Sequence, residues 1–151
     1  MSVCRRLSIG GLAVALLAGT AHGDDKESLR NDALLLMGAS VLPPGTAAYC
    51  NKYVEPNDRL IAAAVAWNKR NDAALKQIVH VFQWTGGMSD ADRVALDRYA
   101  YQLVKESVES EPDRVGYCSG IADQLDGGGM DLDRRDTTAP ALKRIMAAKT
   151  E

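Results

Sequence analysis

Residues 57–84 read NDRLIAAAVAWNKRNDAALKQIVHVFQW, and this stretch decides the fold class. A mostly apolar stripe recurs in it every three or four residues, which is the spacing of one face of an α-helix. The stripe consists of Leu60, Ala64, Trp67, Asn71, Leu75, Ile78 and Phe82. Asn57 or Asp58 suits an N-terminal cap, so the pattern predicts a long helix from there to about Trp84.

Asn71 is the polar residue in this stripe, and two interpretations fit it. Asn71 caps a second helix, because asparagine favours such positions, or it is a buried polar residue in one unbroken helix. We favour the unbroken helix, in which the buried amide needs hydrogen-bond partners.

Towards the N-terminus, the sequence predicts two shorter helices separated by a break. The first covers residues 26–37 and ends at Gly38. Pro43, Pro44 and Gly45 then interrupt the chain, and Thr46 caps a short helix that ends before Pro56.

Towards the C-terminus, glycine and capping signals separate three further helices. Thr85, Gly86 and Gly87 end the long helix, and Ser89 with Asp92 forms the capping pair of a helix that runs to about Ser110. Apolar residues fall on two adjacent faces of that helix, which predicts a central position with contacts on two sides. The two faces are Val94, Tyr101, Val104, Val108 and Leu96, Ala100, Leu103.

Two more helices complete the chain. Pro112 suits the first turn of a helix that carries Val115, Cys118, Ile121, Ala122 and Leu125 and ends at residues 127–129. The last helix covers about residues 138–148. No convincing run of alternating or β-branched residues predicts a sheet, so we expect an all-α fold: a compact bundle of about five or six helices.

The N-terminal 23 residues have the layout of an export signal. Arg5 and Arg6 precede an uncharged apolar run over residues 7–19, and small residues follow, which predicts cleavage after Gly23 or alternatively after Ala21. The run is shorter than the roughly 20 residues that cross a bilayer, so we expect no permanent membrane anchor. The remaining residues, 24–151, are expected to form a single helical domain in the periplasm or outside the cell.

Cleavage of this leader removes Cys4 and leaves Cys50 and Cys118. Two cysteines in an exported chain predict a disulfide, because the compartments outside the cytoplasm are oxidising. Neither cysteine belongs to a C-x-x-C motif, so a structural bridge is favoured over a redox pair and over covalent haem attachment.

The 151 residues are 46% hydrophobic and 25% charged, with a net charge of −2, which is ordinary for a globular protein and argues against a nucleic-acid binder. Loss of the leader removes two arginines and no acid, so the charge falls to −4. Nine acidic residues against three basic ones concentrate in residues 106–136. Such a region can select a basic partner.

Chemical motifs are scarce. His80 is the single histidine after the leader, too few for a zinc site of the usual kind, and no nucleotide-binding glycine motif or G-x-S-x-G nucleophile motif occurs. The carboxylates around the glycines at 127–129 do not have the spacing of a calcium loop. We therefore expect no catalytic residue, metal or cofactor.

The candidate partner-binding residues lie in two places. Asp126, Asp131, Asp133 and Asp136 belong to the acidic region, and Trp67, Lys69 and Arg70 form a cluster on the long helix. Trp67 lies on the inward stripe, which predicts core packing, whereas an exposed Trp67 beside two cations would be an anchor for a partner.

Three functional hypotheses follow. The first is an exported protein-binding module, most concretely an inhibitor or immunity protein that neutralises a secreted toxin or envelope hydrolase. The second is a small-molecule or lipid carrier, although no surplus of apolar residues marks a cavity. The third is a carboxylate-dependent hydrolase, for which spacing singles out no acidic pair.

Overall fold

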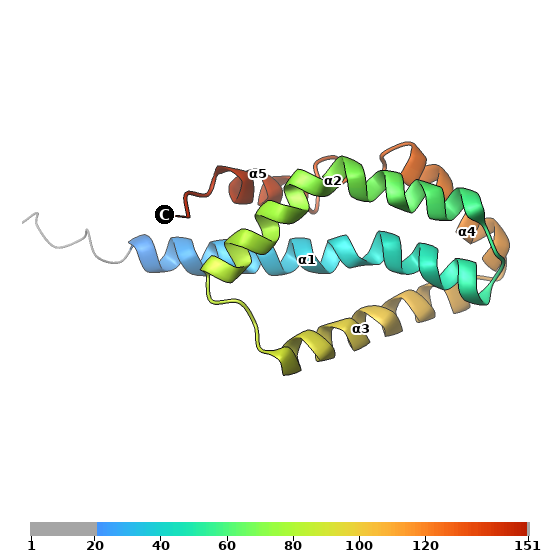
Figure 1. Cartoon of the computed structure of the whole chain (residues 1–151), viewed down its shortest axis with the longest axis horizontal. Coiled ribbons are helices and arrows are strands. Elements are labelled where there is room, and N and C mark those ends of the chain that lie inside the picture. Colours follow the sequence, from blue (N-terminus) through green and yellow to red (C-terminus); the bar gives the residue numbers. More distant parts are fainter. Residues whose placement is uncertain (1–20, 151) are drawn as a thin grey trace, which may run out of the picture.

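In the computed structural model, which describes residues 21–150 and the side chains of residues 25–150, the chain is all-helical (Figure 1). The helices are α1 (Ala21–Tyr53), α2 (Asp58–Trp84), α3 (Asp90–Glu109), α4 (Arg114–Asp126) and α5 (Ala139–Ala147). No strand occurs in this part of the chain. The expected all-α bundle is confirmed, with five helices; residues 1–20, which hold most of the predicted leader, lie outside the described part.

Helix α1 lies at the centre and contacts each of the other four helices. Figure 1 shows it running through the middle of the molecule, with α2 and α5 on one side and α3 on the other. The core is one cluster of buried side chains from all five helices and the segment before α5. Its largest fully buried side chains include Trp67, Leu36, Leu60, Ile78 and Leu125.

The predicted break at residues 43–45 is wrong, because α1 continues through Pro43 and Pro44. Prolines in a helix leave the carbonyls four residues earlier without their usual amide donors. Here Pro43 is fully buried, and contacts with four helices outweigh that loss. Gly38 and Gly45 do not adopt the positive φ that ends helices, and Thr46 is a buried residue inside α1 rather than a cap.

Helix α2 is unbroken, as the apolar stripe predicted. Asn57 caps it by accepting a hydrogen bond from the Leu60 amide at 2.9 Å. The helix ends at Trp84, and Gly86 and Gly87 just after it both have positive φ. The capping pair of Ser89 and Asp92 at the start of α3 is also present.

The prediction that residues 90–109 form a central helix is wrong. Helix α3 contacts only α1 and α4 among the helices of residues 21–150, and Val104 and Val108 are its buried residues. Val94, Tyr99 and Tyr101 are each about half exposed. Two apolar faces are present as expected, but α1 covers only the strip of α3 where these faces meet.

The last two helices lie close to their predicted positions. Asp113, rather than Pro112, begins α4 by accepting a hydrogen bond from the Gly116 amide. Helix α5 starts at Ala139 with Pro140 in its first turn. The predicted disulfide joins Cys50 near the end of α1 to Cys118 in α4, with 5.9 Å between the Cα atoms.

Candidate functional site

Helices α1 and α3 run parallel and touch along a narrow seam. A Cβ atom added at Gly45 would lie 3.4 Å from a Val104 methyl group, and the Tyr49 hydroxyl donates a hydrogen bond to Glu109 at 2.7 Å. Each α1 residue is therefore level with the α3 residue about 60 positions later. Gly45 of α1 thus lies within van der Waals reach of Val104 on α3, and a cleft opens on either flank of this contact.

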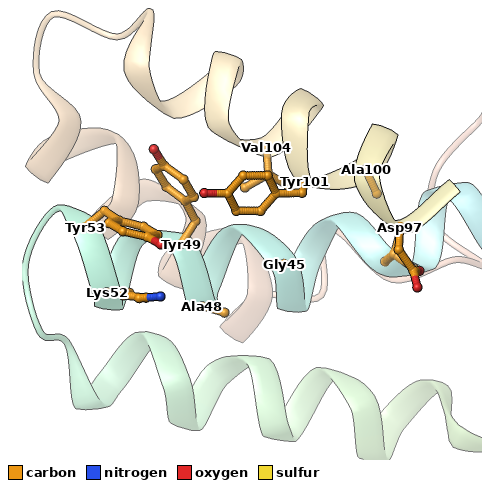
Figure 2. A pocket seen from close by; sticks show the side chains of 10 residues that line it. Gly45, Ala48, Tyr49, Lys52, Tyr53, Asp97, Ala100, Tyr101 and Val104 are labelled. Carbon is orange, nitrogen blue, oxygen red and sulfur yellow. The ribbon is translucent and has the colours of Figure 1, made fainter. Parts of the chain in front are cut away.

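The tyrosine cleft is the first of these openings and has a volume of about 320 Å³. It is lined by Val41, Gly45, Ala48, Tyr49, Lys52, Tyr53, Asp97, Ala100, Tyr101 and Val104. Figure 2 shows three tyrosines on its wall, with Lys52 towards one end and Asp97 at the other. The ring centroids of Tyr49 and Tyr53 are 4.7 Å apart, and those of Tyr49 and Tyr101 are 6.0 Å apart.

The phenols of this cleft have different electrostatic surroundings. The hydrogen bond to Glu109, together with burial, raises the pKa of Tyr49 to about 12. Lys52 and Tyr101 beside the Tyr53 hydroxyl lower the pKa of Tyr53, because a neighbouring ammonium favours phenolate. The neighbouring Tyr53 hydroxyl and burial raise the pKa of Tyr101. The lining of the cleft is thus mostly apolar and phenolic, with Lys52 and Asp97 as its charged residues.

The leucine cleft lies on the other flank of α3 and has a volume of about 340 Å³. It is lined by Leu34, Leu35, Gly38, Ala39, Val41, Leu42, Leu96, Tyr99, Ala100, Leu103, Arg135, Thr137 and Thr138. Tyr99 lines this cleft and Tyr101 the other, because side chains two positions apart on a helix point in nearly opposite directions. Leu35 and Tyr99 are about half exposed, so an apolar strip faces solvent.

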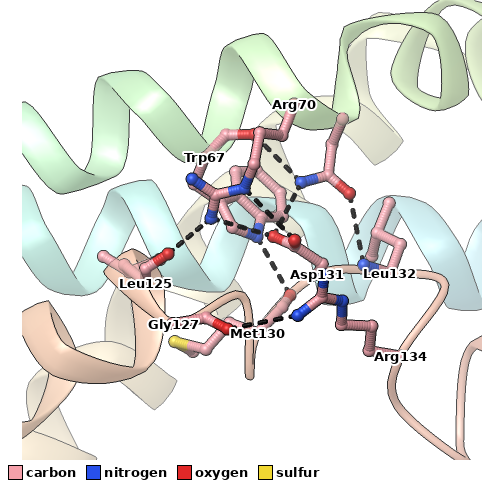
Figure 3. A network of polar contacts seen from close by, with 9 residues as sticks. Trp67, Arg70, Leu125, Gly127, Met130, Asp131, Leu132 and Arg134 are labelled. Carbon is pink, nitrogen blue, oxygen red and sulfur yellow. Dashed lines mark hydrogen bonds and ion pairs between the residues drawn. The ribbon is translucent and has the colours of Figure 1, made fainter.

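Two of the candidate residues predicted from sequence, Trp67 and Asp131, lie inside the molecule (Figure 3). Trp67 is fully buried and donates its indole hydrogen bond to the Met130 carbonyl at 3.0 Å. Asp131 accepts hydrogen bonds from Arg70 at 3.1 and 3.2 Å and from Asn71 at 3.2 Å. Arg70 also donates to the Leu125 carbonyl. These contacts fasten the segment after α4 to α2.

The other candidates are exposed. Asp126, together with Asp123, forms an ion pair with Arg59 on α2. Lys69, Asp133 and Asp136 lie on the surface, and Asp136 stands between two residues that line the leucine cleft, Arg135 and Thr137. The structure thus separates the acidic candidates into buried or paired structural groups and two exposed carboxylates. Asp136 adjoins the leucine cleft, whereas Asp133 lines a separate pocket beside Arg70 and Asp131.

His80 is exposed on α2, and its Nε2 atom lies 2.6 Å from the Thr150 hydroxyl oxygen. Among the described residues, no group of three or more histidine, cysteine, aspartate or glutamate side chains could hold a metal ion. Residues 25–53 of α1 are long and apolar enough to cross a membrane by length and composition alone. Central helices of globular proteins pass the same test, and α1 is such a helix here.

Sequence reasoning missed both clefts. The two apolar faces of α3 were visible in the sequence. An apolar face does not reveal, however, whether the surface that packs against it belongs to the same chain. No family model, curated protein or solved structure matches this chain. The functional argument therefore depends on the chemistry of the surface.

Proposed function

We propose that the chain is an exported protein-binding module, of the kind that inhibits or neutralises a secreted enzyme or toxin, and that it binds its partner through the leucine cleft. The observation that carries the proposal is the apolar strip of Leu34, Leu35 and Tyr99, which faces solvent between two helices. Exposed apolar surface of this kind marks interaction sites, and tyrosine is enriched among the residues that dominate binding energy.

The surroundings of the cleft define the chemistry of the partner. An apolar side chain of the partner enters between α1 and α3, and a basic side chain beside it faces Asp136. Opposite charges at the rim accelerate association and select the partner, while the apolar contact holds it. The disulfide supports an oxidising compartment, and we place the protein in the periplasm or outside the cell after removal of residues 1–23.

A pulldown from the cell-envelope and secreted fractions tests this function. The oxidised protein is expected to capture a stoichiometric partner at low salt, and Leu35→Lys is expected to abolish capture. Val79→Lys on α2 is the matched control, because Val79 and Leu35 are aliphatic residues with 46% and 49% exposure. Purified partner is then titrated against all three proteins. Equal binding by Leu35→Lys and wild type would exclude the leucine cleft as the site.

A carrier of long-chain carboxylic acids is the second candidate, favoured by Arg135 at the rim of a cleft lined by leucines. A guanidinium group there would pair with the carboxylate while the cleft takes the chain. The open cleft favours a protein partner, since carriers bury most of their ligand. Native mass spectrometry discriminates the two: a fatty acid retained by wild type and lost in Arg135→Gln supports the carrier.

A further inference from the structure

The tyrosine cleft is a second surface, on the flank of α3 that the proposed function does not use. Tyr53 and Tyr101 are 52% and 47% exposed, although their rings are large enough to form part of a core. Val94 lies on the same face of α3 as Tyr101, at a spacing of two helical turns, and is also about half exposed. This flank therefore exposes large apolar side chains to solvent, as expected of a surface that binds another molecule.

The ends of the cleft carry opposite charges. Asp97 is level with residue 38 of α1, because the parallel register pairs Gly45 with Val104. Lys52 lies 14 residues further along α1, so the two charges are separated by roughly 20 Å along the helix axes. The Lys52 ammonium lies 4.8 Å from the ring centroid of Tyr53, at the edge of the aromatic surface. Figure 2 shows Tyr49 and Tyr101 between these two charges and Tyr53 beside Lys52.

A surface with a cation at one end and an anion at the other is complementary to itself. A two-fold axis through the middle of the cleft, perpendicular to the helices, exchanges the ends and brings Lys52 of one copy to Asp97 of the other. Closed symmetric dimers require such self-complementary surfaces.

We propose that the tyrosine cleft is the interface of a symmetric homodimer, in which α1 and α3 of two copies pack as a four-helix layer. Tyr53 and Tyr101 of each copy cover those of the other. Lys105 is half-buried on α3, and its charge contributes to the lowered pKa of Tyr53. Because the cleft is small and its rim is charged, the dimer is expected to have micromolar affinity that falls with salt.

Sedimentation velocity over a range of protein concentrations tests the dimer, using the oxidised full chain. Wild type is expected to pass from monomer to dimer. Lys52→Glu and Asp97→Lys are each expected to weaken the dimer about tenfold, since each reversal turns two attractive pairs into two repulsive ones. The double variant K52E/D97K is expected to regain dimerisation, because the reversed charges again face each other.

Lys69→Glu is the matched control, since it reverses an exposed lysine on α2 outside both clefts and should leave dimerisation unchanged. Circular dichroism verifies that each variant folds. A monomer at every concentration, or no recovery in the double variant, would overturn the proposal. Leu35→Lys separates the two proposals, because it is expected to lose the captured partner and keep the dimer.

Discussion

Asn71 connects α2 to the segment between α4 and α5 through both ends of its amide. Its nitrogen donates to the Trp67 carbonyl at 2.9 Å and to Asp131 at 3.2 Å, and its oxygen accepts from the Leu132 amide at 3.2 Å. The buried polar residue of the unbroken helix thus has a partner for each of its groups. The sequence indicated the burial of Asn71, but two of its partners, Asp131 and Leu132, lie about 60 residues away and have no local signal.

Replacement of Asn71 by alanine is expected to lower the free energy of unfolding by about 1–3 kcal/mol, because the buried Leu132 amide loses its acceptor. Urea denaturation followed by circular dichroism measures the change. Asn68→Ala is the matched control, since Asn68 is an exposed asparagine on the same helix and its loss should cost less than about 0.5 kcal/mol. Equal stability of the two variants would contradict the structural role of Asn71.

Because of Tyr49, the stability of the folded protein depends on pH in the alkaline range. Its pKa is raised from 10.0 to about 12 in the folded protein, because the phenol donates to Glu109. Between these values the unfolded chain has released the proton and the folded chain still holds it, so stability falls as pH rises. The contribution of this phenol is present in full below pH 10 and lost as pH approaches 12.

Thermal denaturation of wild type and Tyr49→Phe between pH 9 and pH 11.5 measures this effect. The difference in Tm between the two proteins is expected to be constant below pH 10 and to shrink above it. Glu109→Gln provides a second comparison, since it removes the charged acceptor and should reduce the alkaline slope. A constant difference across the whole range would contradict the assignment.

At the scale of elements, α1 shows where local signals fail. The glycines after α2 and α4 were read correctly as helix ends, because Gly86, Gly87 and Gly128 adopt positive φ. Pro43–Gly45 looked like an equally clear end, yet packing against four helices holds the chain helical there. The prediction for α3 failed in the opposite sense, because its apolar faces implied more neighbours than the other helices of residues 21–150 supply.

The continuous helix makes a prediction for Pro44, which is partly exposed in the middle of α1. Pro44→Ala restores an amide that can donate to the Ser40 carbonyl, and we expect it to raise the free energy of unfolding by about 1–2 kcal/mol. Pro112→Ala, outside the helices, is expected to act in the opposite direction by about 0.4–1 kcal/mol, since it only adds freedom to the unfolded chain. Destabilisation by Pro44→Ala would indicate a bend at residue 44.

At the scale of the whole molecule, periodicity in the sequence was sufficient for the helical class and for most core residues of α2, although it missed Ala63 and Val81. The cysteine count predicted the disulfide. Periodicity identifies which side chains avoid water, but it does not reveal how helices distant in sequence are arranged. The leucine and tyrosine clefts arise from that arrangement, since α3 meets α1 along one seam and leaves both of its flanks open. The candidate surface was therefore visible only after the helices were placed.

The disulfide constrains the molecule as a whole, because it joins positions separated by 68 residues. In the chain-entropy description, opening a loop of this size adds enough freedom to the unfolded chain to cost about 4 kcal/mol. The double variant C50A/C118A is therefore expected to unfold at much lower urea concentration than the oxidised wild type, and the reduced wild type should behave like the variant. Because both cysteines are buried, small cavities add to the loss in the variant. A reduced wild type as stable as the oxidised protein would show that packing around α1 alone determines the stability, and the argument for an oxidising compartment would lose its physical basis.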